Sequence, residues 1–138
     1  MIKIAIIGSR DFSDYEYFKS EFELFLKENN IKDYKIVSGG ARGADTFGRN
    51  YAKSQNNEII EFIPNWEKYG KRAGFLRNYD IWDNSDMGIA FWDGKSTGTA
   101  HSFEITKKQN KILKVINYVT KESWYLNKPE IWWKEEYE

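Results

Sequence analysis

Short apolar runs rich in isoleucine and valine recur along the chain, separated by longer stretches in which apolar and polar residues mix. The first run, Ile2 to Ile7, has apolar side chains at nearly every position, which is typical of a strand buried on both faces of a parallel sheet. Comparable runs occupy 34–37, 58–63, 86–92 and 112–116. We predict a strand in each of these segments.

The stretches between the apolar runs predict helices. Ser13 and Glu16 have the spacing of a capping box, and phenylalanines then follow at helical intervals, so an amphipathic helix of about four turns is expected. Helices are also expected after Asp45, over 66–82 and over 99–110. This alternation predicts an α/β fold: a single Rossmann-like, doubly wound parallel sheet of about five strands with flanking helices.

The alternation ends after residue 117, and the remaining tail is rich in aromatic residues. We expect one domain over 1–118 and a C-terminal extension over 119–138 that packs on the domain or at a subunit interface. Clustered aromatic side chains cover the exposed edge of a sheet or become buried between subunits. We therefore expect a homo-oligomer from the tail aromatics, which are Trp124, Tyr125, Trp132 and Trp133.

The size and composition of the chain are those of one globular domain. Its 138 residues, 41% hydrophobic and 30% charged, are enough for a single buried core. No apolar run is long enough to span a bilayer, and the run from Ile2 to Ile7 is too short for the core of a signal peptide. These features predict a cytoplasmic protein with no membrane partner.

Charge and the missing residue types exclude several functions. Lysine plus arginine equals aspartate plus glutamate at 21 each, so the molecule as a whole has no basic field to attract nucleic acid. Cysteine is absent and histidine occurs once, at His101. Disulfides, cysteine nucleophiles and cysteine–histidine zinc sites are therefore excluded. We predict no metal and no cofactor.

Three glycine-rich loops each follow a predicted strand and precede a predicted helix. They occupy 8–10, 38–45 and 93–99. The carboxyl ends of parallel strands share one edge of the sheet, and open α/β sheets bind ligands at that edge. Helix amino termini leave N–H groups unpaired there, and glycine lets a ligand approach the backbone. One such loop is also ordinary turn chemistry, but three in register predict a site for a phosphate-bearing ligand.

Side chains in these loops complete the expected anion site. Arg10, Arg42 and Lys95 supply positive charge, and serine and threonine hydroxyls add hydrogen bonds. None of the loops matches the G-x-x-x-x-G-K-[ST] or the G-x-G-x-x-G pattern. The mismatch disfavours a P-loop NTPase and an ordinary dehydrogenase.

Several other side chains have both a functional and a structural interpretation. Trp92 directly precedes a glycine loop, so it either stacks on a base or lies buried under the loop, and Trp66 is a further candidate for stacking. Asp45 either binds a ribose hydroxyl or a metal, or simply suits the positive end of a helix dipole, and Asp11 is open in the same way. His101 is either a general acid or base or a surface or packing residue.

Four segments, in this order and spacing, carry a resemblance to a known family. They are Gly8-Ser9-Arg10-Asp11-Phe12, Ser38-Gly39-Gly40-Ala41-Arg42-Gly43-Ala44-Asp45, Gly70-Lys71-Arg72-Ala73-Gly74-Phe75-Leu76-Arg77-Asn78 and Gly94-Lys95-Ser96-Thr97-Gly98-Thr99. The chain resembles the SLOG superfamily, specifically its YspA-like, YpsA-related branch, over residues 2–116. The resemblance implies a Rossmann-like fold that binds nucleotides or nucleotide-derived signals. It also makes Arg77 and Asn78 similar to the family's arginine–asparagine pair, with Arg77 contacting a phosphate or a ribose.

The resemblance extends distantly to the lonely-guy phosphoribohydrolases, which use a G-G-x-G-T-x-x-E motif. Ser102 stands where the glutamate of that motif would be. Glu104 follows two residues later, about 200° around a helix, and cannot simply replace it. This departure favours a binding protein over a hydrolase.

We therefore expect the protein to bind a nucleotide or an NAD- or ADP-ribose-derived ligand, as a sensor or a sequestering protein. The alternative is an N-glycosidic hydrolase in which Arg77 orients the phosphate and Glu104 or Asp45 supplies the carboxylate. A second alternative, single-stranded nucleic-acid binding, rests on the aromatic content and is disfavoured by the zero net charge. The predicted ligand-binding residues are Gly8, Ser9, Arg10, Ser38, Gly39, Gly40, Ala41, Arg42, Gly43, Asp45, Arg77, Asn78, Trp92, Gly94, Ser96, Thr97, Gly98 and Thr99.

Overall fold

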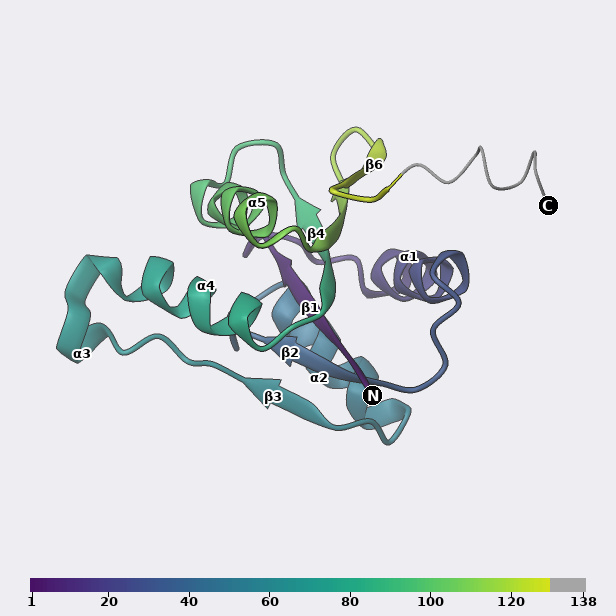
Figure 1. The fold of residues 1–138 in the computed structure, drawn as a ribbon, viewed down its shortest axis with the longest axis horizontal. Helices are drawn as coiled ribbons and strands as arrows, with labels where there is room; N and C mark the ends of the chain where they lie inside the picture. Colours follow the sequence, from purple (N-terminus) through teal and green to yellow (C-terminus); the bar gives the residue numbers. More distant parts are fainter. Residues whose placement is uncertain (130–138) are drawn as a thin grey trace.

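The computed structural model describes residues 1–129, and within them the strands form one six-stranded sheet in the order β3-β2-β1-β4-β5-β6 (Figure 1). The first five strands in sequence are parallel, whereas β6 is antiparallel to β5. The strands are β1 (Ile2–Gly8), β2 (Tyr34–Ser38), β3 (Ile59–Glu61), β4 (Met87–Trp92), β5 (Ile112–Asn117) and β6 (Ser123–Leu126). This arrangement confirms the predicted Rossmann-like α/β fold.

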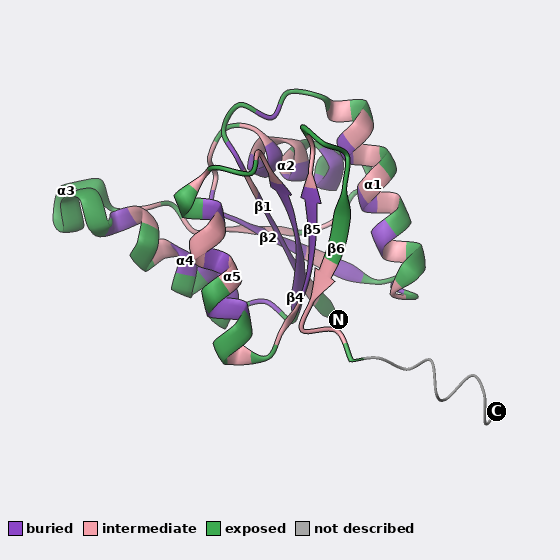
Figure 2. Cartoon of the chain, turned by 90° about the horizontal axis from the view of Figure 1, so that it is seen from above, coloured by how far each residue is buried: buried purple, intermediate pink, exposed green. Residues whose placement is uncertain are grey.

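Helices cover both faces of the sheet, as a doubly wound fold requires (Figures 1 and 2). They are α1 (Tyr15–Glu28), α2 (Ala44–Ser54), α3 (Trp66–Tyr69), the short 3₁₀ helix η1 (Gly70–Arg72), α4 (Ala73–Asp83) and α5 (Thr97–Gln109). The apolar sides of α1 and α2 form one buried cluster with alternate residues of the central strands. Residues of α4 and α5 form a second cluster with the other strand face. Packing in these two clusters fixes the positions of the carboxyl ends of the strands relative to one another.

Two local predictions need correction. The side chain of Asp14, not Ser13, caps α1, because it accepts the Tyr17 N–H at 3.0 Å. The helix expected over 66–82 is interrupted after Tyr69, because Gly70 has a φ of +57°, outside the right-handed helical region, and the chain then continues through η1 into α4. The division allows α3 to extend away from the sheet at one end of the molecule (Figures 1 and 2).

The part of the C-terminal tail that the structure describes adds a sixth strand that local patterning did not predict. β6 lies along the outer edge of β5, and Tyr125 anchors it to α1. The Tyr125 hydroxyl donates to Glu28 Oε1 at 2.7 Å and accepts from Asn29 Nδ2 at 3.0 Å. Buried Lys114 pairs with the same Glu28 oxygen at 2.7 Å. Trp132 and Trp133 lie outside the described residues, and the division into 1–118 and 119–138 stays a prediction.

In the part of the chain that the structure describes, no helix has both the length and the apolar character needed to cross a membrane.

Candidate functional site

A cavity of about 410 Å³ opens at the carboxyl edge of the sheet, where the three glycine loops meet. Its volume is within the range of small-molecule sites. The loop after β1, the loop after β2, helix α4 and the first turn of α5 all contribute to its wall. The predicted ligand-binding residues that line it are Gly8, Ser9, Arg10, Ala41, Asp45, Arg77, Asn78, Ser96, Thr97, Gly98 and Thr99.

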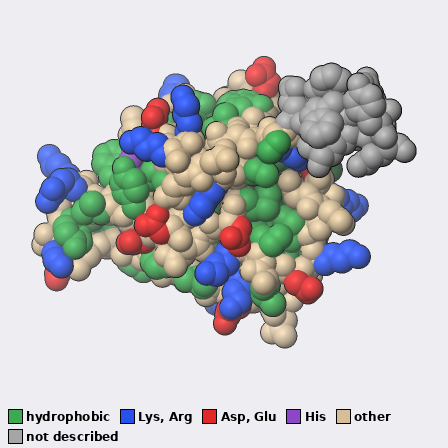
Figure 3. Space-filling model, in the orientation of Figure 1, with side chains coloured by type: hydrophobic (Ala, Val, Ile, Leu, Met, Phe, Trp, Pro, Cys, Tyr) green, Lys and Arg blue, Asp and Glu red, His purple; other side chains and the backbone are tan. Residues whose placement is uncertain are grey.

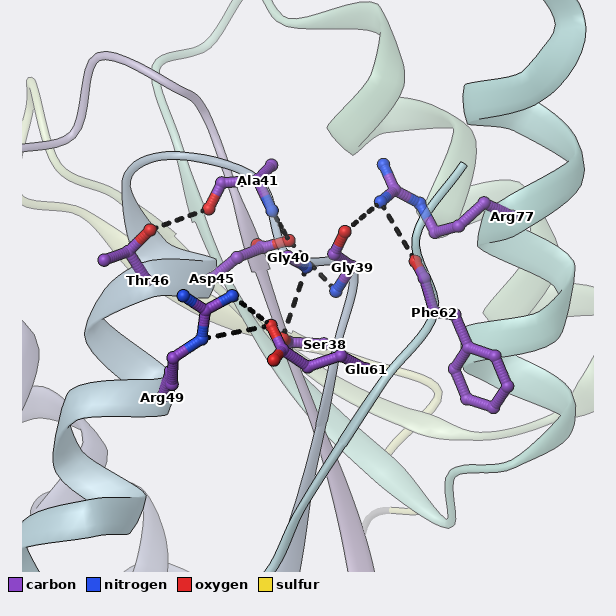
Figure 4. A network of polar contacts seen from close by, with 10 residues as sticks. All are labelled: Ser38, Gly39, Gly40, Ala41, Asp45, Thr46, Arg49, Glu61, Phe62 and Arg77. Carbon is purple, nitrogen blue, oxygen red and sulfur yellow. Dashed lines mark hydrogen bonds and ion pairs between the residues drawn. The ribbon is translucent and has the colours of Figure 1, made fainter. Parts of the chain in front are cut away.

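The loop between β2 and α2 is wrapped around the carboxylate of Asp45 (Figure 4). Asp45 Oδ2 accepts the backbone N–H of Gly39 at 3.0 Å and that of Ala41 at 3.2 Å. The side chain is buried, with 4% of its residue surface exposed, and burial raises the pKa of this carboxyl to about 6 against the opposing effects of the two amides and of Arg77. Asp45 thus organises the loop, and the Gly39 and Ala41 amides point at its carboxylate.

Arg77 of α4 reaches across the cavity to the same loop (Figure 4). Its Nη1 donates to the carbonyl of Gly39 at 2.6 Å and to that of Phe62 at 3.4 Å. Burial lowers the pKa of Arg77, Asp45 raises it, and the charge of Arg10 lowers it further, which places all three groups in one electrostatic cluster. Within residues 1–129 no group accepts a hydrogen bond from Nη2. That edge of the guanidinium is free to bind an anion.

Gly39 is required for this placement of Arg77. A Cβ on Gly39 would lie 2.1 Å from Arg77 Nη1, so any larger residue there would displace the guanidinium. Gly43 is required for a different reason, because its φ is +80° and a Cβ would lie 2.4 Å from the carbonyl oxygen of Ser9. The glycines therefore bring the first two loops into contact with each other and with α4.

Asn78 connects Arg77 to the first turn of α5. Its Oδ1 accepts Arg77 Nε–H at 3.3 Å, and its Nδ2 donates to the carbonyl of Gly98 at 3.3 Å. The Ser96 side chain caps the helix by accepting the Thr99 N–H. The N–H groups of Thr97 and Gly98 precede the intrahelical hydrogen-bond ladder and have no acceptor within residues 1–129. A guanidinium edge and two helix-terminal amides therefore lie on either side of one asparagine.

Contacts between the first and third loops fix the remaining wall. The Ser9 hydroxyl accepts the Asp93 N–H at 3.1 Å. Asp93 Oδ1 in turn accepts the N–H groups of Lys95 at 2.8 Å and Ser96 at 2.7 Å. These bonds form a tight turn before α5, which aims the free amides of its first turn into the cavity.

Some predicted site residues lie elsewhere. Gly39, Gly40 and Arg42 line a second cavity of about 280 Å³, which shares Arg10, Ala41, Trp66 and Arg77 with the first. The residues that line neither cavity are Ser38, Gly43, Trp92 and Gly94. Glu104 is exposed and also lies outside both.

The structure gives Trp92 and His101 packing contacts. The Trp92 indole N–H donates to the carbonyl of Ser96 at 3.1 Å, and its ring packs edge-on against Phe103. The His101 ring lies between Phe75 and Tyr79, and its Nδ1 faces Asn78 Nδ2 at 3.2 Å. Because that amide nitrogen is a donor, His101 is held as the neutral tautomer with the proton on Nε2. Burial lowers the pKa of His101.

The cavity also contains residues that the site prediction left out. Lys71 comes from η1, Gly74 and Phe75 come from the first turn of α4, and Asp93 and Ser102 come from either side of the α5 amino terminus. Lys71 and Phe75 belong to the 70–78 motif, so the signal was present in the sequence. Within the described residues, no group of three or more His, Asp or Glu side chains is arranged to hold a metal ion.

Comparison with known proteins gives two matches. The model of a family described as the YspA, cpYpsA-related SLOG family matches residues 2–69, which include the first two glycine loops. The chain is also 32% identical, over 126 residues, to the Gene 61 protein of Mycobacterium phage D29, and the alignment covers 86% of this chain and 97% of that protein. No solved structure matches the chain significantly.

Proposed function

We propose that this chain, which belongs to the YspA, cpYpsA-related SLOG family, binds a nucleotide or an NAD- or ADP-ribose-derived ligand through its phosphate groups. Membership of this family fits a nucleotide-related ligand. One observation carries the proposal. Asn78 hydrogen-bonds both Arg77 and the first turn of α5, and so holds the free edge of the Arg77 guanidinium and the unpaired amides of Thr97 and Gly98 at one cavity.

The chemistry of this pairing suits a phosphate. Helix amino termini stabilise anions through their unpaired N–H groups and their partial positive charge. A guanidinium adds a charge-assisted hydrogen bond of fixed direction. Trp66 and Phe75 lie on the same cavity wall and are half exposed, so they offer ring faces to a base. In this proposal the protein acts in the cytoplasm as a sensor of the ligand or as a sequestering protein.

A ligand panel tests the proposal directly. Purified protein is heated with AMP, ADP, ADP-ribose, NAD and inorganic phosphate in separate scans. A ligand at about 100 times its Kd is expected to raise Tm by roughly 5 to 10 °C. Mass spectrometry of small molecules released on denaturation is expected to recover the same compound intact. A panel in which no nucleotide changes Tm contradicts the proposal.

Asp45 favours the N-glycosidic hydrolase as a second candidate. Its carboxyl lines the cavity with a pKa of about 6, and a raised pKa is what a general acid needs near neutral pH. Against this candidate, one of its oxygens already accepts two loop amides. Release of a free base from a nucleotide by wild-type protein but not by Asp45→Asn would establish the hydrolase.

Replacing Gly98 by alanine is expected to change stability and binding in opposite directions. No atom lies within 4 Å of a Cβ built at Gly98, and alanine favours a helix over glycine, so the free energy of unfolding should rise by about 0.5 to 1 kcal/mol. The new methyl group projects where the phosphate would approach the Thr97 and Gly98 amides, so nucleotide affinity should fall. Urea denaturation and calorimetric titration measure the two effects. Unchanged affinity would remove the α5 amino terminus from the phosphate site.

The proposed homo-oligomer remains a prediction. Of the tail aromatics on which this prediction rests, Trp124 and Tyr125 lie within the described residues, and Trp124 is 37% exposed. Light scattering at several protein concentrations tests it.

A further inference from the structure

Helix α4 has large apolar side chains on the face that points away from the core. Its inward face consists of Ala73, Asn78, Ile81 and Trp82, all buried. The opposite face carries six exposed residues, here called the α4 stripe: Arg72, Phe75, Leu76, Tyr79, Asp80 and Asp83. Their positions three, four, seven, eight and eleven residues after Arg72 place them on one side of a helix, and the backbone of Arg72 is itself helical.

The centre of the α4 stripe is apolar and partly exposed, with the His101 ring of α5 covering one side of Phe75 and Tyr79. Phe75 is 44% exposed, Leu76 39% and Tyr79 41%. The outer face of a surface helix normally carries charged and polar side chains, so a contiguous apolar patch there marks a contact surface. Figure 3 shows hydrophobic side chains on the surface at the end of the molecule where α3 and α4 lie, with basic and acidic side chains around them.

The two ends of the α4 stripe carry opposite charges. Arg72 is at the amino-terminal end, and Asp80 and Asp83 are in the carboxyl-terminal turn. None of the three forms an ion pair with another residue of 1–129. Asp83 Oδ1 accepts from the uncharged Gln109 amide at 2.8 Å, which leaves its charge unpaired. A stripe that is basic at one end, apolar in the middle and acidic at the other is complementary to itself when reversed.

We infer that the α4 stripe is the interface of a homodimer in which two α4 helices pack antiparallel about a two-fold axis. A two-fold interface joins the same patch on both subunits. The axis passes between Leu76 and Tyr79, so that Leu76 contacts the partner's Tyr79. Arg72 then faces the partner's Asp83 at both ends. A parallel arrangement would place like charges together, which destabilises an interface.

This interface borders the ligand cavity, because Phe75 belongs to both the α4 stripe and the cavity wall. The partner subunit therefore lies at the mouth of the site. The inference is independent of the ligand, since it rests on the outer face of α4 alone.

The mass in solution tests the interface. Wild-type protein is expected to have the mass of two chains by light scattering, and Leu76→Asp the mass of one. Leu24→Asp is the matched control, because Leu24 of α1 is exposed to a similar extent, 44%, and lies outside the stripe. Circular dichroism checks that both variants are folded. A wild-type monomer at millimolar concentration, or a dimer that survives Leu76→Asp, would overturn the inference.

Charge exchange tests the antiparallel orientation. Arg72→Asp and Asp83→Arg each place like charges opposite each other and are expected to raise the dimer Kd by roughly tenfold. The double variant restores opposite charges and is expected to recover the wild-type Kd. Failure of the double variant to recover would contradict the antiparallel pairing.

Discussion

Replacing Arg77 by alanine is expected to weaken nucleotide binding by roughly one to two orders of magnitude. A hydrogen bond to a charged group contributes about 1.5 to 3 kcal/mol, and Nη2 is the group that would make it. Arg77→Lys keeps the charge but loses the planar fork that reaches Gly39 and the ligand together, so its affinity should lie between those of alanine and wild type. Isothermal titration calorimetry with the best ligand of the panel measures both.

A charge-matched control separates this effect from a general change in surface potential. Lys107 is exposed in the last turn of α5, at the opposite end from the cavity, and Lys107→Ala should bind as wild type does. Arg77→Ala also removes a donor from two backbone carbonyls, which should lower the free energy of unfolding by about 1 kcal/mol each. A folded Arg77→Ala with unchanged affinity would show that the phosphate binds elsewhere.

Replacing Asp45 by asparagine is expected to change how stability depends on pH. The carboxyl has an ordinary pKa of 3.8 and a pKa of about 6 in the folded protein. Between these values the folded state binds more protons than the unfolded state, so Asp45 lowers stability as pH rises through this window. The full effect is about 3 kcal/mol. Asparagine resembles the protonated carboxyl and does not titrate.

The comparison of wild type with Asp45→Asn isolates this contribution from other carboxyl groups. The two proteins should have similar free energies of unfolding near pH 4, and the variant should be the more stable by up to about 3 kcal/mol above pH 6. Urea denaturation across this range measures the difference. A difference that is independent of pH, or one that favours wild type at high pH, would show that the pKa of Asp45 is not raised.

A buried charge that lowers stability is a common feature of binding sites. The charge of Asp45 holds the Gly39 and Ala41 amides inward and supports the nearby guanidinium of Arg77. Asp45→Asn should therefore gain stability and lose ligand affinity.

The alternation of strands and helices was predictable because each element carries its own signal. β1, β4 and β5 are buried on both faces, so their residues are apolar at almost every position. β6 has no such signal. It is four residues long and half exposed, and its position depends on contacts of Tyr125 with Glu28 and Asn29, which are far away in the sequence.

The position of the cavity was also predictable, because parallel strands bring their following loops to one edge. The role of Asp45 was not. Its spacing from Gly39 and Ala41 allows the helix-dipole interpretation equally well, and only the folded loop shows which amides its carboxylate accepts. Similarly, the sequence left Trp92 open between stacking and burial, and the hydrogen bond of its indole to Ser96 was visible only in three dimensions.

The central position of β1 has a consequence for how the chain is made. β1 pairs with β4 across the middle of the sheet, and the backbone N–H of Lys3 donates a hydrogen bond to the carboxylate of Asp86, which lies 83 residues later in the chain. During synthesis β1 and β2 leave the ribosome well before β4, so their apolar faces stay exposed until the rest of the core has been made. Pairings between strands that are distant in the sequence slow folding and leave aggregation-prone intermediates exposed. A nascent chain halted before Met87 should therefore depend on chaperones, and a chain that has emerged beyond Asn117 should not.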